Sequence, residues 1–248
     1  MVHHLVKRGA IAGVTLIGLE MAYAVLRPAP ELEEFDPSGS FGDPTLPTLR
    51  VVVLGDSSVT APGVSGPEEC WVSLVADRLA TDRHIILESV AVSGSCAHDL
   101  VRDQLQAAMD LEPDLIFVSV GGNDVIKGVS RRRFESNLDQ LIGELSGTGA
   151  TIVMSGVGDL GTIPRLVPPL RQMFSQRSAA YDRIHHRVAA RHGAHVVEQR
   201  SDRPDVWYSD RSLWAADLFH VSAAGHRRWA DTVWATVESV FDGARGPG

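Results

Sequence analysis

The sequence predicts an α/β protein, a three-layer α/β/α sandwich in which helices cover both faces of a five-stranded parallel sheet. Two observations lead to this fold class. Short runs of β-branched and other apolar residues recur along the chain, as in strands buried on both faces, and segments with helical spacing of apolar residues separate them. The strands are expected at residues 50–54, 85–92, 115–120, 152–154 and 195–197.

Helical spacing of apolar residues is clearest in segments 71–79 and 134–145, and a last helix is expected from about Ser222 to Phe241. In open parallel sheets, ligands bind beyond the carboxyl ends of the strands. Residues directly after strands are therefore the first place to look for function.

The composition is that of an ordinary globular protein. Of the 248 residues, 44% are hydrophobic and 22% are charged, which suits one folded domain. The formal net charge is −8, and Arg131-Arg132-Arg133 is the main basic cluster. Nucleic acid is therefore not expected as a partner.

The first 26 residues have the pattern of an export signal. Lys7 and Arg8 precede an apolar run over residues 9–19, and Glu20 separates it from a second apolar patch. Ala22-Tyr23-Ala24 resembles a cleavage site, whereas the whole stretch 9–26 approaches the length of a membrane anchor. A buried or amphipathic helix of a cytosolic protein remains the alternative. The expected location is outside the cytoplasm, either secreted or associated with a membrane through residues 9–26.

Residues 27–48 are expected to be a linker, because they combine five prolines with several acidic residues, glycines and serines. The folded domain is then expected over residues 49–243.

The first strand runs directly into Gly55-Asp56-Ser57-Ser58. A serine on a tight turn at the carboxyl end of a strand is exposed and lies near free backbone N–H groups, as a nucleophile requires. Taken alone, the string is more often an ordinary turn or a helix N-cap.

The next two strands are also followed by residues suited to anion stabilisation. Gly94 lies after the second strand, where its backbone N–H can approach a developing oxyanion closely. Asn123 follows the third strand in Gly121-Gly122-Asn123-Asp124, and its amide can donate to the same point.

Asp217 and His220 lie three residues apart before the last helix. At this spacing on a bend the carboxylate can hydrogen-bond the imidazole, fix its tautomer and stabilise the imidazolium. The nearby helix N-terminus favours the neutral imidazole, which is the form that a general base needs.

These four segments, in this order, resemble the blocks of the SGNH (GDSL-like) hydrolase family. The resemblance covers residues 50 to about 241 and implies the flavodoxin-like SGNH fold. By matching position it implies that Ser57 is the nucleophile and His220 the base oriented by Asp217. It further implies an oxyanion hole formed by the N–H groups of Ser57 and Gly94 and the amide of Asn123.

Two positions depart from the family pattern. Ser58 stands where the family usually has a leucine-like side chain, and the glycine block reads Val-Ser-Gly-Ser-Cys-Ala. Both changes affect the expected pocket wall. His226 is a rival base without an acid at the matching offset, and Asp210 is a rival orienter.

No metal and no cofactor are expected. His185, His186, His192 and His195 lack metal-ligand spacing and neighbouring carboxylates, and the two cysteines form no zinc pattern. Cys70 and Cys96 are either free thiols or, in an exported domain, one disulfide.

An apolar, proline-interrupted segment at residues 160–174 is expected either to line an acyl-chain pocket or to pack on the domain itself. For Trp207, Tyr208 and Trp214 the alternatives are likewise to line the mouth of the pocket or to pack in the core.

The sequence as a whole predicts a serine hydrolase that cleaves carboxylic esters of small molecules, lipids or acylated sugars. An acyltransferase or carbohydrate O-deacetylase on the same residues is the alternative within this chemistry. A catalytically inactive binding domain at the cell surface is the alternative outside it.

Overall fold

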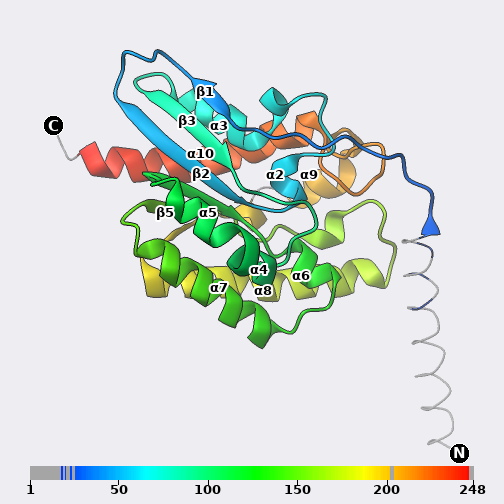
Figure 1. Cartoon of the computed structure of the whole chain (residues 1–248). Helices are drawn as coiled ribbons and strands as arrows, with labels where there is room; N and C mark the ends of the chain where they lie inside the picture. The colour runs from blue at the N-terminus through cyan, green and yellow to red at the C-terminus, as the bar shows by residue number, and fades with distance from the viewer. Residues whose placement is uncertain (1–17, 19, 21–22, 24–25, 202–203, 246–248) are drawn as a thin grey trace, which may run out of the picture.

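The computed structural model describes residues 18, 20, 23, 26–201 and 204–245 (Figure 1). The expected signal peptide or anchor at residues 1–26 lies almost entirely outside this range. Within the described part of the chain, no helix combines the length and apolar character needed to cross a bilayer.

A six-stranded sheet forms the centre of the molecule, in the order β1-β3-β2-β4-β5-β6. All neighbouring strands are parallel except β1, which runs antiparallel to β3 at the sheet edge. The strands are β1 (Gly39–Phe41), β2 (Thr48–Gly55), β3 (His84–Ser89), β4 (Leu115–Ser119), β5 (Thr151–Met154) and β6 (His195–Val196). The predicted five-stranded parallel sheet is thus confirmed, with one antiparallel strand added.

Helices cover both faces of the sheet, as Figure 1 shows. The longer helices are α3 (Trp71–Leu79), α7 (Arg131–Ser146), α8 (Leu170–His192) and α10 (Ala223–Arg245). Shorter ones are α2 (Ser57–Thr60), α4 (Ala97–Asp99), α5 (Leu105–Asp110), α6 (Gly122–Ile126) and α9 (Pro204–Ser209), and a π-helical turn (Leu100–Gln104) joins α4 to α5. Single 3-10 turns occur at η1 (Pro67–Glu69), η3 (Leu160–Thr162), η4 (Gln199–Ser201) and η5 (Arg211–Leu213).

Alternate residues of each central strand enter two separate cores, because successive side chains point to opposite faces of a sheet. Val52 and Ile116 pack with α5, α7 and α8 on one face. Val51 and Phe117 pack with α3 and α10 on the other. The three-layer arrangement therefore follows from continuous apolar strands that need cover on both sides.

The expectation that residues 27–48 form an unpaired linker is wrong for residues 39–41. Gly39, Ser40 and Phe41 pair with Leu87, Ile86 and Ile85 of β3. An edge strand needs only backbone pairing on one side, so a short segment between prolines can supply it. The fold therefore begins before residue 48.

Several strand boundaries also differ from the sequence prediction, by one to three residues. The chain leaves the sheet at Ser89 rather than at Val92, and β6 has only two residues. Both differences occur at the carboxyl ends of the strands.

Candidate active site

Ser57 is the first residue of α2, directly after the carboxyl end of β2. The side chain of Asp56 caps this helix by accepting a hydrogen bond from the Ser58 N–H at 2.9 Å. A side chain at Gly55 would come within 2.7 Å of the Ser119 carbonyl oxygen, so β2 and β4 can approach here only because residue 55 is glycine.

The side chain of Gln104 holds the nucleophile turn through two hydrogen bonds to the backbone of Gly55. Its amide oxygen accepts from the Gly55 N–H at 2.9 Å, and its amide nitrogen donates to the Gly55 carbonyl at 2.9 Å. The side chain is almost fully buried. No sequence signal identifies this role, because a glutamine in a helical stretch ordinarily faces solvent.

His220 and Asp217 form a direct hydrogen bond of 2.6 Å between the imidazole Nδ1 and the carboxylate Oδ2. The other carboxylate oxygen of Asp217 accepts from the backbone N–H groups of Phe219 and His220, at 2.9 and 3.0 Å. Burial raises the pKa of Asp217, but these hydrogen bonds outweigh burial and hold the pKa below its ordinary value. With Nδ1 engaged, Nε2 is the ring nitrogen left to exchange a proton.

The loop between these two residues is held by Arg165. Its guanidinium donates to the Asp217 carbonyl at 2.9 Å, and its backbone N–H donates to the Leu218 carbonyl at 3.1 Å. Leu218 has a φ of +61°, a conformation that non-glycine residues rarely adopt. The position of His220 therefore depends on a strained turn and on a cation from the distant segment after β5.

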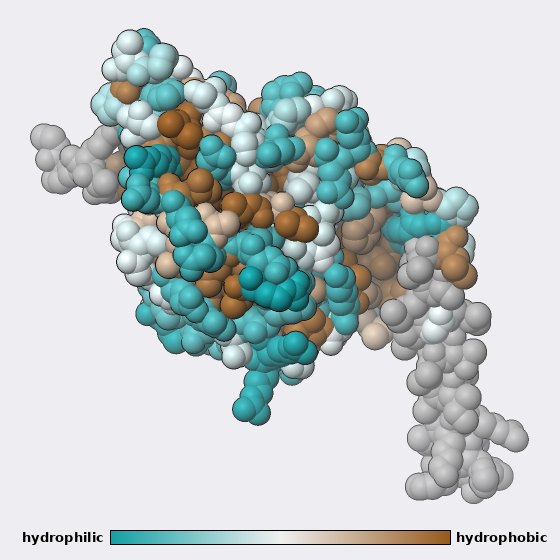
Figure 2. All heavy atoms as spheres, in the orientation of Figure 1, coloured by the Kyte–Doolittle hydropathy of each residue, from teal (hydrophilic) through white to brown (hydrophobic). Residues whose placement is uncertain are grey.

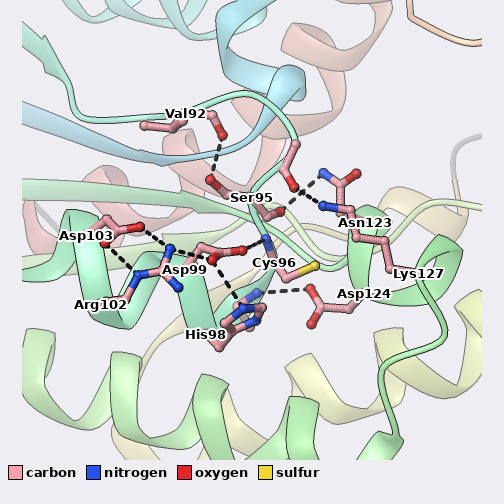
Figure 3. Close-up of polar contacts among 12 residues, drawn as sticks. Val92, Ser95, Cys96, His98, Asp99, Arg102, Asp103, Asn123, Asp124 and Lys127 are labelled. Atoms are coloured by element: carbon pink, nitrogen blue, oxygen red, sulfur yellow. Dashed lines mark hydrogen bonds and ion pairs between the residues drawn. The ribbon is translucent and has the colours of Figure 1, made fainter.

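Asn123 lies in α6, next to the nucleophile turn. Its amide nitrogen donates to Asp56 Oδ2 at 3.0 Å and to the Ser95 carbonyl at 3.2 Å. Figure 3 shows Asn123 facing the loop that contains Ser95. Burial raises the pKa of Asp56, while the hydrogen bonds from Ser58 and Asn123 oppose that rise.

Gly94 has a φ of +77°, which explains why glycine occupies this position. Its carbonyl accepts from Lys127 Nζ at 2.7 Å (Figure 3). Lys127 follows α6, so it ties the glycine loop to the helix that carries Asn123.

One cavity of about 190 Å³ brings most of the candidate residues together. Ser57, Asn123 and His220 line it, and Asp217 contacts His220 from behind. Gly94 is not among its lining residues, so a role of Gly94 as oxyanion donor stays a prediction.

The walls of this cavity are largely apolar. Both sequence alternatives for segment 160–174 hold in part. Leu160 and Ile163 line the cavity, whereas Leu166 and Leu170 lie outside the lining and pack with Ile163 into a small buried cluster. The other large apolar residues that line the cavity are Pro62, Val120, Ile126, Val157, Trp207, Trp214, Phe219, Val221 and Trp229. Tyr208 is exposed and lies outside the lining.

Ser58, the departure from the family pattern, belongs to a chain of hydroxyl groups beneath the cavity. Its Oγ lies 2.6 Å from Ser119 Oγ, which accepts from Ser155 Oγ at 2.9 Å. Ser58 and Ser119 also line the cavity. The wall beside the nucleophile is therefore polar here, although the sequence had not indicated Ser119 or Ser155.

The rival residues are occupied elsewhere. His226 is buried, its Nδ1 accepts from the Trp71 N–H at 3.2 Å, and burial lowers its pKa to about 3. Asp210 caps η5 through Ser212. Burial likewise lowers the pKa of His185 to about 3. Cys70 and Cys96 are free, buried thiols.

Beside the glycine loop, Cys96, His98 and Asp99 bring potential metal-ligand atoms within 4.8 Å of one another (Figure 3). The carboxylate of Asp99 is already engaged. It accepts from the Cys96 N–H at 2.9 Å and pairs with Arg102 at 2.8 Å. Asp99 therefore serves as a helix cap and as an ion-pair partner.

Comparison with known proteins decides the family. The model of the GDSL-like lipase/acylhydrolase family matches residues 53–228, which span the nucleophile turn, the Asn123 segment and the Asp217–His220 loop. The chain belongs to this family. All of the predicted site residues lie within the segment that matches the GDSL-like model.

Among relatives in the GDSL-like family, a GDSL-like esterase of Mycobacterium tuberculosis is 27% identical over 202 residues, which are 78% of this chain and 63% of the relative. The chain thus spans less than two thirds of that relative's length. The esterase TesA of Pseudomonas aeruginosa is 24% identical over 193 residues, covering 77% of this chain and 89% of TesA.

Solved structures show the same fold. The crystal structure of TesA has a TM-score of 0.64 at 24% identity and covers 77% of this chain and 98% of its own. An acetyl-xylooligosaccharide esterase from a Geobacillus species also has a TM-score of 0.64, at 17% identity, covering 76% of this chain and 94% of its own. These likenesses confirm the predicted SGNH fold.

Proposed function

We propose that this GDSL-like protein is a serine esterase that hydrolyses carboxylic esters. The observation that carries the proposal is that Ser57 and His220 line one apolar cavity while His220 is hydrogen-bonded to Asp217 at 2.6 Å. An apolar cavity with a few polar groups suits an acyl group and its ester carbonyl. The names of the curated relatives, both esterases, support the same reaction.

In the proposed first step, Ser57 Oγ attacks the ester carbonyl carbon and His220 Nε2 takes the hydroxyl proton. Asp217 stabilises the imidazolium that results. The tetrahedral intermediate then collapses, the C–O bond to the alcohol breaks, and the imidazolium gives its proton to the departing alcohol oxygen. Water repeats the sequence on the acyl-enzyme and releases the acid.

The proposed oxyanion hole requires a change at Asn123. Both of its amide hydrogens are engaged, by Asp56 and by the Ser95 carbonyl. The bond to Ser95 is the longer of the two and has a neutral acceptor, so it is the one that a negatively charged oxyanion would replace. Asp56 would hold the amide in place during this exchange, and the N–H groups of Ser57 and Gly94 would complete the hole.

Replacing the nucleophile gives the decisive test. The full chain in mild detergent is incubated with a fluorophosphonate probe and with p-nitrophenyl acetate, butyrate and octanoate. Ser57→Ala is expected to abolish labelling and to lower turnover about 10⁴-fold or more. The matched control Ser65→Ala changes an exposed serine eight positions away and should leave both unchanged. Equal turnover by Ser57→Ala and wild type would contradict the proposal.

A carbohydrate O-deacetylase is the second candidate, because one structural neighbour is named as an acetyl-xylooligosaccharide esterase. Acetate release from acetylated xylooligosaccharides, compared with p-nitrophenyl butyrate hydrolysis, ranks the two. An added acceptor alcohol that is converted to a new ester would instead identify an acyltransferase.

Export of the domain is proposed on the sequence of residues 1–26 alone. A fusion of residues 1–30 to a reporter that is active only outside the cytoplasm should give a signal. A reporter that stays silent would contradict export.

A further inference from the structure

The N-terminal segment meets the domain at the edge of the sheet where the strands end, beside the candidate active site. The Arg27 carbonyl accepts a hydrogen bond from the Arg165 guanidinium, which also donates to the Asp217 carbonyl. In Figure 1 the first described segment runs past α9 and α2 before it reaches β1. The link between the N-terminus and the domain therefore touches the loop that carries His220.

Two further contacts keep this segment on the same edge. The Phe35 N–H donates to the Thr60 carbonyl at the end of α2, at 2.8 Å. Ser38 Oγ accepts from the Ser89 N–H at the carboxyl end of β3, at 2.9 Å. Residues 27–38 are therefore bound along the carboxyl ends of the strands, which we call the catalytic edge. Little free chain separates Leu26 from the domain.

Large hydrophobic side chains are exposed on segments that follow the carboxyl ends of β3, β5 and β6. Three belong to the folded domain: Val92 is 56% exposed, Met173 45% and Tyr208 57%. Val92 follows β3 and its N–H donates to the Gly55 carbonyl, next to the nucleophile turn. Met173 lies in the first turn of α8 and Tyr208 in α9, where the Arg171 guanidinium covers its ring at 4.6 Å.

The remaining two lie on the approach to the domain, where Tyr23 is 56% and Leu26 78% exposed. Figure 2 shows hydrophobic residues on the right of the view, beside the grey atoms of the N-terminal residues. Single exposed apolar residues are normal on a protein surface, but several on segments at the same end of a sheet are typical of a contact surface. Tyrosine and arginine beside aliphatic side chains suit the interface between lipid and water.

We propose that this catalytic edge docks on a lipid bilayer and that the enzyme takes esters presented at that surface. The proposal rests on the proposed esterase function and on the apolar segment 9–26 as the membrane-associated part. Leu26 is followed at once by Arg27, which is bound to the domain through Arg165. An apolar segment that enters the bilayer would therefore hold the mouth of the cavity against the lipid. The apolar cavity wall then receives an acyl chain directly from the membrane.

The experiment compares two ester pools for the full chain reconstituted in phosphatidylcholine vesicles. One pool is p-nitrophenyl butyrate in the water phase, and the other is a fluorogenic long-chain ester dissolved in the vesicles. The test variant combines Val92→Ser, Met173→Ser and Tyr208→Ser. The control is Val240→Ser, which changes a partly exposed valine near the far end of α10.

The triple variant is expected to lower turnover of the vesicle ester about tenfold, because surface affinity scales with the apolar area that enters the lipid. Turnover of the soluble ester should stay within about twofold of wild type, since none of the three side chains lines the cavity. Val240→Ser should change neither rate.

An unchanged ratio of the two rates in the triple variant would overturn the proposal. A parallel loss of both rates would also overturn it, because these side chains would then act on the fold or the site instead of on lipid contact. A wild-type chain that hydrolyses neither ester contradicts the esterase function itself. Turnover of the soluble ester thus distinguishes a failure of the lipid-docking proposal from a failure of the esterase function.

Discussion

The two halves of the proposed catalytic apparatus are fastened to the molecule by different means. Ser57 follows β2, a central strand, and the buried Gln104 side chain holds both backbone groups of Gly55 just before it. His220 lies on the long connection between β6 and α10 and depends on the turn at Leu218 and on Arg165. The nucleophile is placed by the core of the sheet, whereas the base is placed by a loop and one cation. Damage to the first should therefore reduce stability, and damage to the second should reduce turnover.

The largest effect is expected when the partner of His220 is changed. Asp217→Asn keeps the shape of the side chain but removes the charge that stabilises the imidazolium and can select the wrong imidazole tautomer. Turnover of p-nitrophenyl butyrate should fall about 10⁴-fold, by analogy with other triads. Asp210→Asn, at the rival orienter, is the control and should retain wild-type turnover. A larger loss of turnover in Asp210→Asn than in Asp217→Asn would show that Asp217 is not the residue that orients His220.

A smaller effect on turnover is expected at Arg165. Arg165→Gln removes the guanidinium that donates to the Asp217 carbonyl, so the loop that contains Asp217 and His220 should shift relative to Ser57. A displacement of this kind should lower kcat roughly tenfold to a hundredfold. Arg165→Lys should recover part of the loss, while Arg183→Gln, an exposed site on α8, should change nothing. If Arg165→Gln lowers the melting temperature and leaves kcat intact, the proposed contrast fails.

Gln104 should report on stability instead. Gln104→Leu leaves the Gly55 N–H without its side-chain partner in a buried position, which should cost about 1–3 kcal/mol of unfolding free energy. Urea unfolding measures the difference through the midpoint at unchanged slope. The control Gln106→Leu changes an exposed residue of the next turn. Equal midpoints for the two variants would show that Gln104 does not support the turn.

The smallest effect concerns pH. The pKa of Asp217 is lower in the folded protein than its ordinary value of 3.8, so its charge stabilises the fold above that pH. This contribution is lost as the pH falls through the folded pKa. The stability gap between wild type and Asp217→Asn should therefore be wider at about pH 6 than at about pH 3. Urea unfolding at both values measures it, and a gap that widens on acidification would refute the assigned direction.

The sequence predicted the parts of the site that follow from local pattern and from the geometry of parallel sheets. Ser57 and Asn123 come after strands that are neighbours in the sheet, so their meeting at one edge could be anticipated. Gln104 could not, because it reaches Gly55 across 49 positions without any periodic signal. Arg165 reaches Asp217 across 52 positions in the same way.

Strand β1 escaped sequence prediction for a related reason. It has only three residues, Gly39, Ser40 and Phe41, and they pair with a strand more than forty positions later. Short pairings at a sheet edge depend on tertiary contact rather than on propensity. The serine chain from Ser58 to Ser155 likewise exists only because β2, β4 and β5 end side by side.

Strand β1 also determines at which positions proteolysis would expose the edge of the sheet. It covers the outer edge of β3, whose unpaired backbone groups would otherwise offer a template for strands of other molecules. Proteolysis before residue 39 would leave this cover on the domain. Proteolysis after Phe41 would separate the cover from the domain and leave a form prone to aggregate. The short edge strand therefore also protects the domain against self-association.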